Sequence, residues 1–181
     1  MKEKIRTAAL HMFDRHGFYR TGIRDIAGEA GCALPTLYYY YPNKTLLYET
    51  IVCEAYETLC GQMADQLPEG LGLLDTYYYT VMQQGLLSQE DKLVLRLAFR
   101  LRMGLDGGAE ARARVLRWEE ARAGAQERRI RAEIDDPAFA RLLLRVTDHM
   151  LQRIILYGEE PVPEEIRCEL TLLFSVRSAS S

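Results

Sequence analysis

The sequence contains no apolar run as long as the ~18 residues that a membrane-spanning helix needs. Its opening stretch, MKEKIRTAAL, mixes charged with apolar residues and therefore lacks the apolar region of a signal peptide. These two absences predict a cytoplasmic protein.

Cysteines are few and are spread along the chain without any CxxC pair: Cys32, Cys53, Cys60 and Cys168. Zinc sites and disulfide-rich folds need closer and more regular spacing. We therefore expect reduced, mostly buried thiols, with a regulatory thiol as the open alternative. We expect no metal and no other cofactor.

The motifs of several enzyme classes are also missing. There is no HExxH, no GxSxG and no P-loop. Adjacent acid pairs such as Glu119–Glu120 point apart on a helix, so they do not form a paired-carboxylate site. The sequence thus favours a protein without enzymatic activity.

The net charge is −3, but the charges are unevenly distributed. Residues 1–48 carry seven Lys and Arg against four Asp and Glu, about +3. The other residues carry 16 basic against 22 acidic side chains, about −6. This asymmetry predicts that only the N-terminal part contacts phosphate groups.

Residues 21–44, TGIRDIAGEAGCALPTLYYYYPNK, predict two short helices joined by a tight turn. Thr21 can cap the first helix through its hydroxyl, and Gly31 suits the left-handed position that ends it. Pro35 suits the first turn of the second helix, and Asn43 can cap a third. This is the layout of a helix-turn-helix, whose second helix enters the DNA major groove.

Helical periodicity continues along the rest of the chain, with no strand pattern. The expected helices span residues 3–16, 43–66, 71–87, 89–103, 109–134 and 137–157, with a last one from Pro163. We therefore predict an all-α fold. Residues 1–48 form a three-helix domain of the helix-turn-helix type, and residues 49–181 form a second helical domain.

The motifs IRDIA at 23–27, Ala30-Gly31, PTLYYYY at 35–41 and Asn43-Lys44 resemble the DNA-binding signature of the tetracycline-repressor (TetR) family. The resemblance covers roughly the first fifty residues. One departure is Ala33, where the family often has Ser or Thr, so the second helix lacks the usual hydroxyl cap. The resemblance implies a transcriptional regulator, usually a repressor, that binds double-stranded operator DNA.

The resemblance also assigns DNA contacts by position. The residues expected at base edges are Leu34, Pro35, Thr36 and Tyr39. The residues expected at phosphates are Thr21, Tyr38, Tyr40 and Lys44. Arg24 can reach either a guanine or a phosphate. For Tyr41 we expect core packing instead.

In the family, the middle helices enclose a small-molecule pocket, and a bound effector moves the long helix that begins near Asn43 and releases the DNA. The pocket residues implied here are Tyr77, Tyr78, Met82, Phe99, Met103 and Trp118. Each of these can equally belong to a closed core. A DNA binder without a small-molecule effector is therefore an alternative.

The last two helices carry more apolar surface than one neighbouring helix can cover. The apolar residues are Phe139, Leu143, Val146, Met150, Ile154, Ile166, Leu170, Leu173 and Phe174. One explanation is an ordinary buried helix pair, and the other is a homodimer with a four-helix bundle at its interface. The resemblance implies the dimer, and hence a palindromic operator. A helical adaptor that binds only proteins is a further alternative, which the basic residues Arg24 and Lys44 disfavour.

Overall fold

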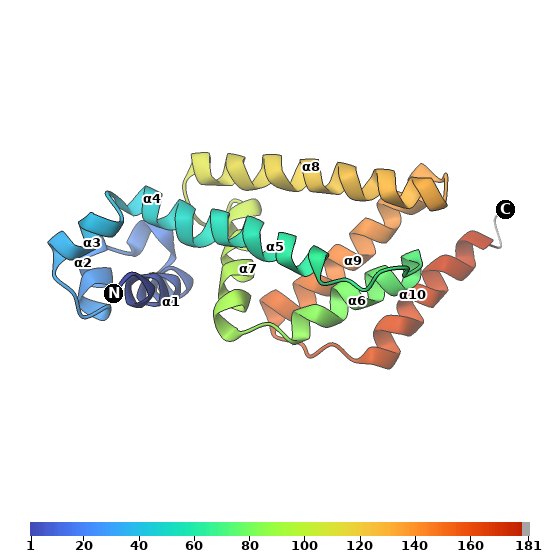
Figure 1. The fold of residues 1–181 in the computed structure, drawn as a ribbon, viewed down its shortest axis with the longest axis horizontal. Helices are drawn as coiled ribbons and strands as arrows, with labels where there is room; N and C mark the ends of the chain where they lie inside the picture. The colour runs from blue at the N-terminus through green and yellow to red at the C-terminus, as the bar shows by residue number, and fades with distance from the viewer. Residues whose placement is uncertain (179–181) are drawn as a thin grey trace. The chain divides into compact units, whose positions relative to one another are not determined.

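The computed structural model describes residues 1–178, and every regular element in that range is a helix (Figure 1). The helices are α1 Lys2–Arg20, α2 Ile23–Glu29, α3 Leu34–Tyr40, α4 Lys44–Tyr48, the π-helical η1 Glu49–Glu54, α5 Ala55–Asp65, α6 Leu73–Gly85, α7 Gln89–Arg102, α8 Ala109–Glu133, α9 Pro137–Tyr157 and α10 Pro163–Ser178. The predicted all-α fold is confirmed. None of these helices is both long and apolar enough to cross a membrane.

The described residues form two compact units. Unit 1 consists of Met1–Cys60 and Ser88–Trp118, and unit 2 consists of Gly61–Leu87 together with the described residues from Glu119 onward. Helices α5 and α8 each contribute residues to both units. The functional division into residues 1–48 and 49–181 stays a prediction.

Unit 1 is built around a cluster of aromatic side chains. The ring of Tyr48 lies edge-on against Phe13 and Phe18, with 5.0 Å between ring centroids in both pairs. Helix α1 packs against α2 and α7, and α7 also packs against η1. Phe13 and Tyr48 are almost completely buried, so this cluster is the centre of the unit's core.

The segment from α4 through η1 to α5 is an uninterrupted helix, as the sequence predicts for residues 43–66. Asn43 caps its start, because the Asn43 side chain accepts a hydrogen bond from Leu46 N at 2.8 Å. The π-helical stretch Glu49–Glu54 was not predicted. It is a local widening of the helix that apolar spacing does not reveal.

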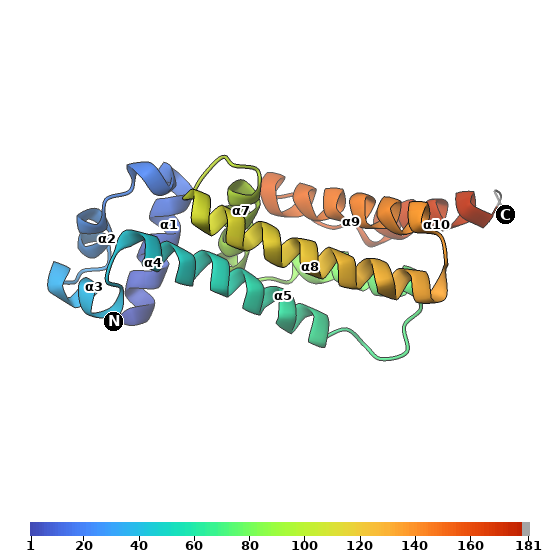
Figure 2. The same ribbon diagram turned by 90° about the horizontal axis from the view of Figure 1, so that it is seen from above.

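In unit 2, helix α6 packs against both α9 and α10 (Figure 1), and α9 runs as one continuous helix (Figure 2). Asp136 caps α9 by accepting hydrogen bonds from Ala138 N and Phe139 N at 2.9 and 3.0 Å. Gly158, with φ at +71°, ends α9 in the left-handed conformation. Local sequence signals therefore set both ends of α9.

Candidate nucleic-acid interface

The turn between α2 and α3 has the predicted geometry. Gly31 adopts φ at +63°, and Cys32 N donates to Ala27 O at 3.0 Å across the end of α2. Ala33 stands at the N-cap of α3 without a side-chain cap, and Pro35 lies in the first turn. The helix-turn-helix that the sequence predicts is therefore present in residues 23–40.

Thr21 does not cap α2, and that prediction is wrong. The N-cap residue of α2 is Gly22, whereas Thr21 lies at the end of α1. The Thr21 hydroxyl donates back to Gly17 O at 2.7 Å and to Met12 O at 3.2 Å, and the residue is only 1% exposed. Because carbonyls at the end of α1 occupy this hydroxyl, it is unavailable to the next helix.

Lys44 lies at the start of α4 and reaches back to the end of α1. Its ammonium donates to Phe18 O at 2.9 Å and to Thr21 O at 3.1 Å, and it lies 4.5 Å from the centroid of the Phe18 ring. A cation at these carbonyls is favourable because the C-terminal end of a helix carries partial negative charge. The sequence did not reveal this structural role, and the predicted phosphate contact stays a prediction.

Helix α3 has one face buried against the protein and the opposite face exposed. Leu37 is completely buried and Tyr41 is 3% exposed, whereas Tyr39 is 83% exposed. The rings of Tyr39 and Tyr40 meet edge-on with 5.1 Å between centroids. The core role predicted for Tyr41 is confirmed, and the predicted base-contacting Tyr39 faces away from the protein.

The other predicted DNA contacts differ in exposure. The exposed ones are Arg24, Pro35 and Tyr38. The half-buried ones are Leu34, Thr36, Tyr40 and Lys44. Tyr19 and Arg20, which were not among the predicted contacts, are also exposed, in the last turn of α1.

The six predicted pocket residues are divided between the two units. Tyr77, Tyr78 and Met82 belong to unit 2, and Phe99, Met103 and Trp118 belong to unit 1. Burial raises the pKa of Tyr77 to about 12. Arg167 lies 4.2 Å from the ring centroid of Tyr78, and Met103 is 56% exposed. A pocket that these six residues share stays a prediction.

The apolar stripe of the last two helices is mostly buried inside a single chain. The buried members are Phe139, Leu143, Met150, Ile154, Ile166 and Leu170, and the half-buried ones are Val146, Leu173 and Phe174. Helix α6 covers much of this stripe, because it packs against both α9 and α10. A different set of apolar side chains on these helices is exposed: Leu142, Leu172 and Val176.

None of the four cysteines forms a disulfide, and only Cys53 among them is buried. The expectation of mostly buried thiols is therefore wrong: Cys32 and Cys60 are half-buried and Cys168 is exposed. Burial raises the pKa of Cys53 to about 12, so its thiol stays protonated. Among residues 1–178 there is no group of three or more His, Cys, Asp or Glu side chains placed to hold a metal ion.

Comparison with known sequences finds a family match that includes the helix-turn-helix. Residues 5–51 match the sequence model of a family described as "Bacterial regulatory proteins, tetR family". Over 65 residues the chain is 37% identical to the HTH-type transcriptional regulator LmrA of Bacillus subtilis (strain 168). That match covers 35% of each protein, so it spans about a third of the relative's length.

Solved structures match the fold over nearly the whole chain. FadR from Bacillus subtilis in complex with stearoyl-CoA has a TM-score of 0.70 at 17% identity, over 96% of this chain and 97% of that chain. The multidrug binding protein EbrR, complexed with malachite green, has a TM-score of 0.68 at 19% identity, over the same shares. Salmonella enterica GusR has a TM-score of 0.66 at 21% identity, over 94% and 93%.

The family match begins in α1 and ends in η1, so it contains the entire helix-turn-helix. The structural likeness, at its low identities, concerns the fold and agrees with that match. Over residues 5–51, which contain the helix-turn-helix, the chain is therefore similar to the TetR family of bacterial regulatory proteins.

Proposed function

We propose that this protein is a sequence-specific DNA-binding transcriptional regulator and that α3 is its major-groove helix. The observation that carries this proposal is the orientation of α3: Leu37 and Tyr41 anchor it, and Tyr39 extends from it at 83% exposure. A rigid helix with an exposed face in a basic domain is the arrangement that reads a major groove. The regulator LmrA, which resembles this chain over 65 residues, supports the same function.

The contacts divide into those that select sequence and those that fix position. We assign base contacts to Leu34, Pro35, Thr36 and Tyr39, with Arg24 at a guanine or a phosphate. We assign phosphate contacts to Tyr38, Tyr40 and Lys44, whose ammonium has a third N–H beyond the two that bind carbonyls. We assign no phosphate contact to Thr21, which the sequence analysis had placed at a phosphate, because its hydroxyl is buried and already hydrogen-bonded within α1.

The proposed working form is a cytoplasmic homodimer. One helix in a major groove covers only a few base pairs, so a dimer reads two half-sites of a palindrome. Leu142 on α9 is exposed, as are Leu172 and Val176 on α10. Apolar residues at this exposure support burial against a second copy.

We further propose that a small-molecule effector binds in unit 2 and releases the DNA, as in a repressor. Thr76 is 6% exposed and its hydroxyl has no hydrogen-bond partner, while the amide of Gln84 reaches only the sulfur of Met63, at 3.5 Å. Buried polar atoms normally have full partners, so these two can bind a polar group of a ligand. FadR and EbrR, similar in fold, were each solved with a bound organic ligand.

The proposal is tested by selecting bound fragments from the source genome and measuring each by gel shift against random-sequence competitor. We expect fragments that are retained at competitor excess, and we expect Tyr39→Ala to lose this preference. Retention of no fragment above random DNA would contradict the proposed function. A ligand that binds should also weaken operator binding, because ligand and DNA favour different conformations. If no ligand changes operator affinity, the protein is a DNA binder without a small-molecule effector.

A further inference from the structure

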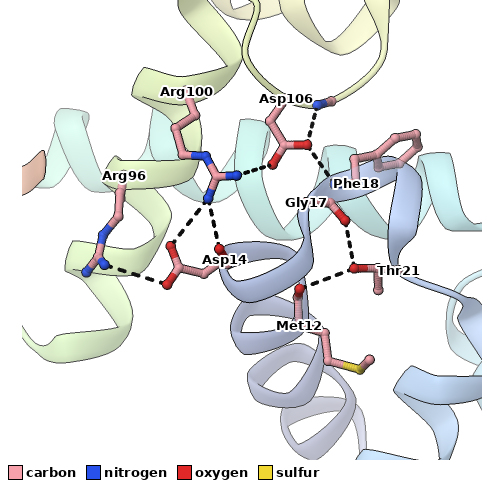
Figure 3. Close-up of polar contacts among 9 residues, drawn as sticks. Met12, Asp14, Gly17, Phe18, Thr21, Arg96, Arg100 and Asp106 are labelled. Carbon is pink, nitrogen blue, oxygen red and sulfur yellow. Dashed lines mark hydrogen bonds and ion pairs between the residues drawn. The ribbon is translucent and has the colours of Figure 1, made fainter.

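A buried carboxylate in the loop between α7 and α8 contacts the turn that leads into α2 (Figure 3). Asp106 is 6% exposed, and its Oδ1 accepts a hydrogen bond from Phe18 N at 2.6 Å. The same oxygen accepts from Gly107 N at 2.8 Å, within its own loop. Asp106 and Phe18 are 88 residues apart in sequence, so neither local pattern nor periodicity predicts this contact.

The contact occurs where α1 is broken. Gly17 has φ at +76° and ψ at +167°, which no helical residue adopts. In an unbroken helix, Phe18 N would donate to the carbonyl of Asp14, four residues earlier. In this structure Phe18 N donates to Asp106, and Asp14 O accepts from Arg100 Nη1 at 2.9 Å.

The two replacement partners are themselves joined. Arg100 Nη2 lies 3.4 Å from Asp106 Oδ2, and Arg100 Nη1 lies 3.7 Å from the Asp14 carboxylate. Arg96 lies 3.6 Å from the same Asp14 carboxylate, so α7 holds this end of α1 with two arginines. The pair Arg100–Asp106 therefore takes the place of the hydrogen bond that the break removes, one member at each side of the gap.

Lys44 and Thr21 hold the same turn through hydrogen bonds to its backbone carbonyls. Lys44 donates to the carbonyls of Phe18 and Thr21, and the Thr21 hydroxyl donates to Gly17 O at 2.7 Å. Helix α2 begins at Ile23, two residues after Thr21. Because so few residues separate the turn from α2, a shift of the turn is transmitted to α2 and to the turn between α2 and α3.

The loop that carries Asp106 is itself closely packed. Gly107 has φ at +73°, and a Cβ there would collide with Leu101 Cδ1 and press on Tyr48 at 3.2 Å. Burial, followed by the nearby Asp106, raises the pKa of Tyr48, so its ring and hydroxyl stay neutral in this core. Asp106 is therefore presented to Phe18 by a loop with a defined position.

We propose that Asp106, oriented by Arg100, is a positioning residue for DNA recognition. It does not touch DNA; it sets the angle at which α2 and α3 leave the break in α1, and it links that angle to the α7–α8 loop. This inference rests on the proposed DNA-binding function, because it concerns the orientation of the same helix-turn-helix.

The test compares operator affinity, random-DNA affinity and thermal unfolding for wild type, Asp106→Ala, Asp106→Asn and Glu90→Gln. Glu90 is the matched control, because its carboxylate also joins α7 to α1, through Thr7 and Arg6, but far along α1 from the break. All binding is measured at a temperature at which circular dichroism shows each variant folded. The DNA is a fragment retained by wild type.

We expect Asp106→Ala to weaken operator binding about tenfold or more, a coupling of ordinary size for linked sites. Random-DNA affinity should change less than about twofold, since the phosphate-contacting charges are intact. Glu90→Gln should leave both affinities within about twofold of wild type. Asp106→Asn keeps an acceptor for Phe18 N but loses the ion pair, so it should fall between wild type and Asp106→Ala.

If Asp106→Ala does not fold, Asp106→Asn is the variant that tests the inference. The double variant Asp106→Asn/Arg100→Gln should then recover part of the operator affinity that Asp106→Asn loses, because two amides can form a hydrogen bond without charge. Operator binding by the folded Asp106 variants equal to wild type, or an equal loss in Glu90→Gln, would overturn the inference. Failure of wild type to retain any fragment would instead overturn the proposed function.

Discussion

At the scale of single residues, exposure separates the side chains of the helix-turn-helix into those that build it and those free to contact DNA. Thr21 and Lys44 belong to the first group through their bonds to backbone carbonyls at the end of α1. Tyr39 belongs to the second, because its side chain leaves α3 away from the core. Residue type alone does not make this distinction, since hydroxyls and ammonium groups serve both purposes.

Tyr39→Ala and Tyr41→Ala form a matched pair on the same helix. We expect Tyr39→Ala to change the free energy of unfolding by no more than about 0.5 kcal/mol, as for an exposed site, while altering base preference at one operator position. Tyr41→Ala should cost about 3–5 kcal/mol, as for other buried aromatic residues. Urea denaturation measures the stability of both variants, and competition binding with single-base operator variants measures the base preference of Tyr39→Ala. Equal stability losses would show that Tyr39 is part of the core.

Lys44→Met retains the length of the side chain and removes its charge. Because the ammonium bonds two carbonyls, we expect the free energy of unfolding to fall by about 1.5–3 kcal/mol. Loss of the phosphate contact made by the third N–H should also make the salt dependence of DNA binding shallower by about one unit of slope. Denaturation and a salt titration check the two roles separately. An unchanged slope with reduced stability would leave Lys44 with the structural role alone.

At the scale of helices, local signals in the sequence predicted most boundaries. Gly31, Pro35, Asn43 and Asp136 act through contacts within a few residues, so their roles were readable without a structure. The contacts of Asp106 with the break in α1 join residues far apart in sequence, and no local pattern encodes them. The same reason explains the error at Thr21, whose partners lie behind it in α1 and not ahead of it in α2.

The contact between α1 and α7 predicts a dependence of stability on pH. Glu90 accepts hydrogen bonds from Thr7 Oγ1 and Arg6 Nη1, both at 2.6 Å, and these bonds hold the pKa of Glu90 below its usual range. A lowered carboxyl pKa stabilises the folded state above the pKa of the unfolded chain, about 4.3, and this stabilisation is lost as pH falls through the folded pKa.

Glu90→Gln should therefore be less stable than wild type at pH 7, and the difference should shrink in acid as Glu90 itself becomes protonated. Chemical denaturation at pH 7, 4 and 3 measures this convergence. A stability difference that stays constant over this range would show that the ionised form of Glu90 is not the source of the effect.

At the scale of the whole molecule, α9 and α10 have two sets of apolar side chains, one buried in the core and one exposed. The sequence predicted that α9 and α10 are apolar but could not tell which residues face α6, because both faces repeat at helical spacing. Leu170 is completely buried, whereas Leu172 is 59% exposed two residues later. The exposed set is the one available to a second copy, and the buried set is not.

Leu172→Asp and Leu170→Asp distinguish the two explanations of the apolar stripe. We expect wild type to have twice the 20.8 kDa mass of one chain by light scattering, and Leu172→Asp to shift toward one chain while staying helical. Leu170→Asp should unfold the protein, because an unpaired charge would enter the core. A folded Leu172→Asp variant with wild-type mass would place the interface elsewhere.

The most direct measurement is a hydroxyl-radical footprint of the purified protein on a selected genomic fragment. We predict two protected half-sites related by two-fold symmetry, with centres about 34–36 Å apart or at a multiple of that spacing, as two α3 helices of one dimer require. Protection should disappear from both half-sites in Tyr39→Ala at competitor concentrations that wild type withstands. Uniform protection along the fragment, or a single half-site without a symmetric partner, would contradict the account.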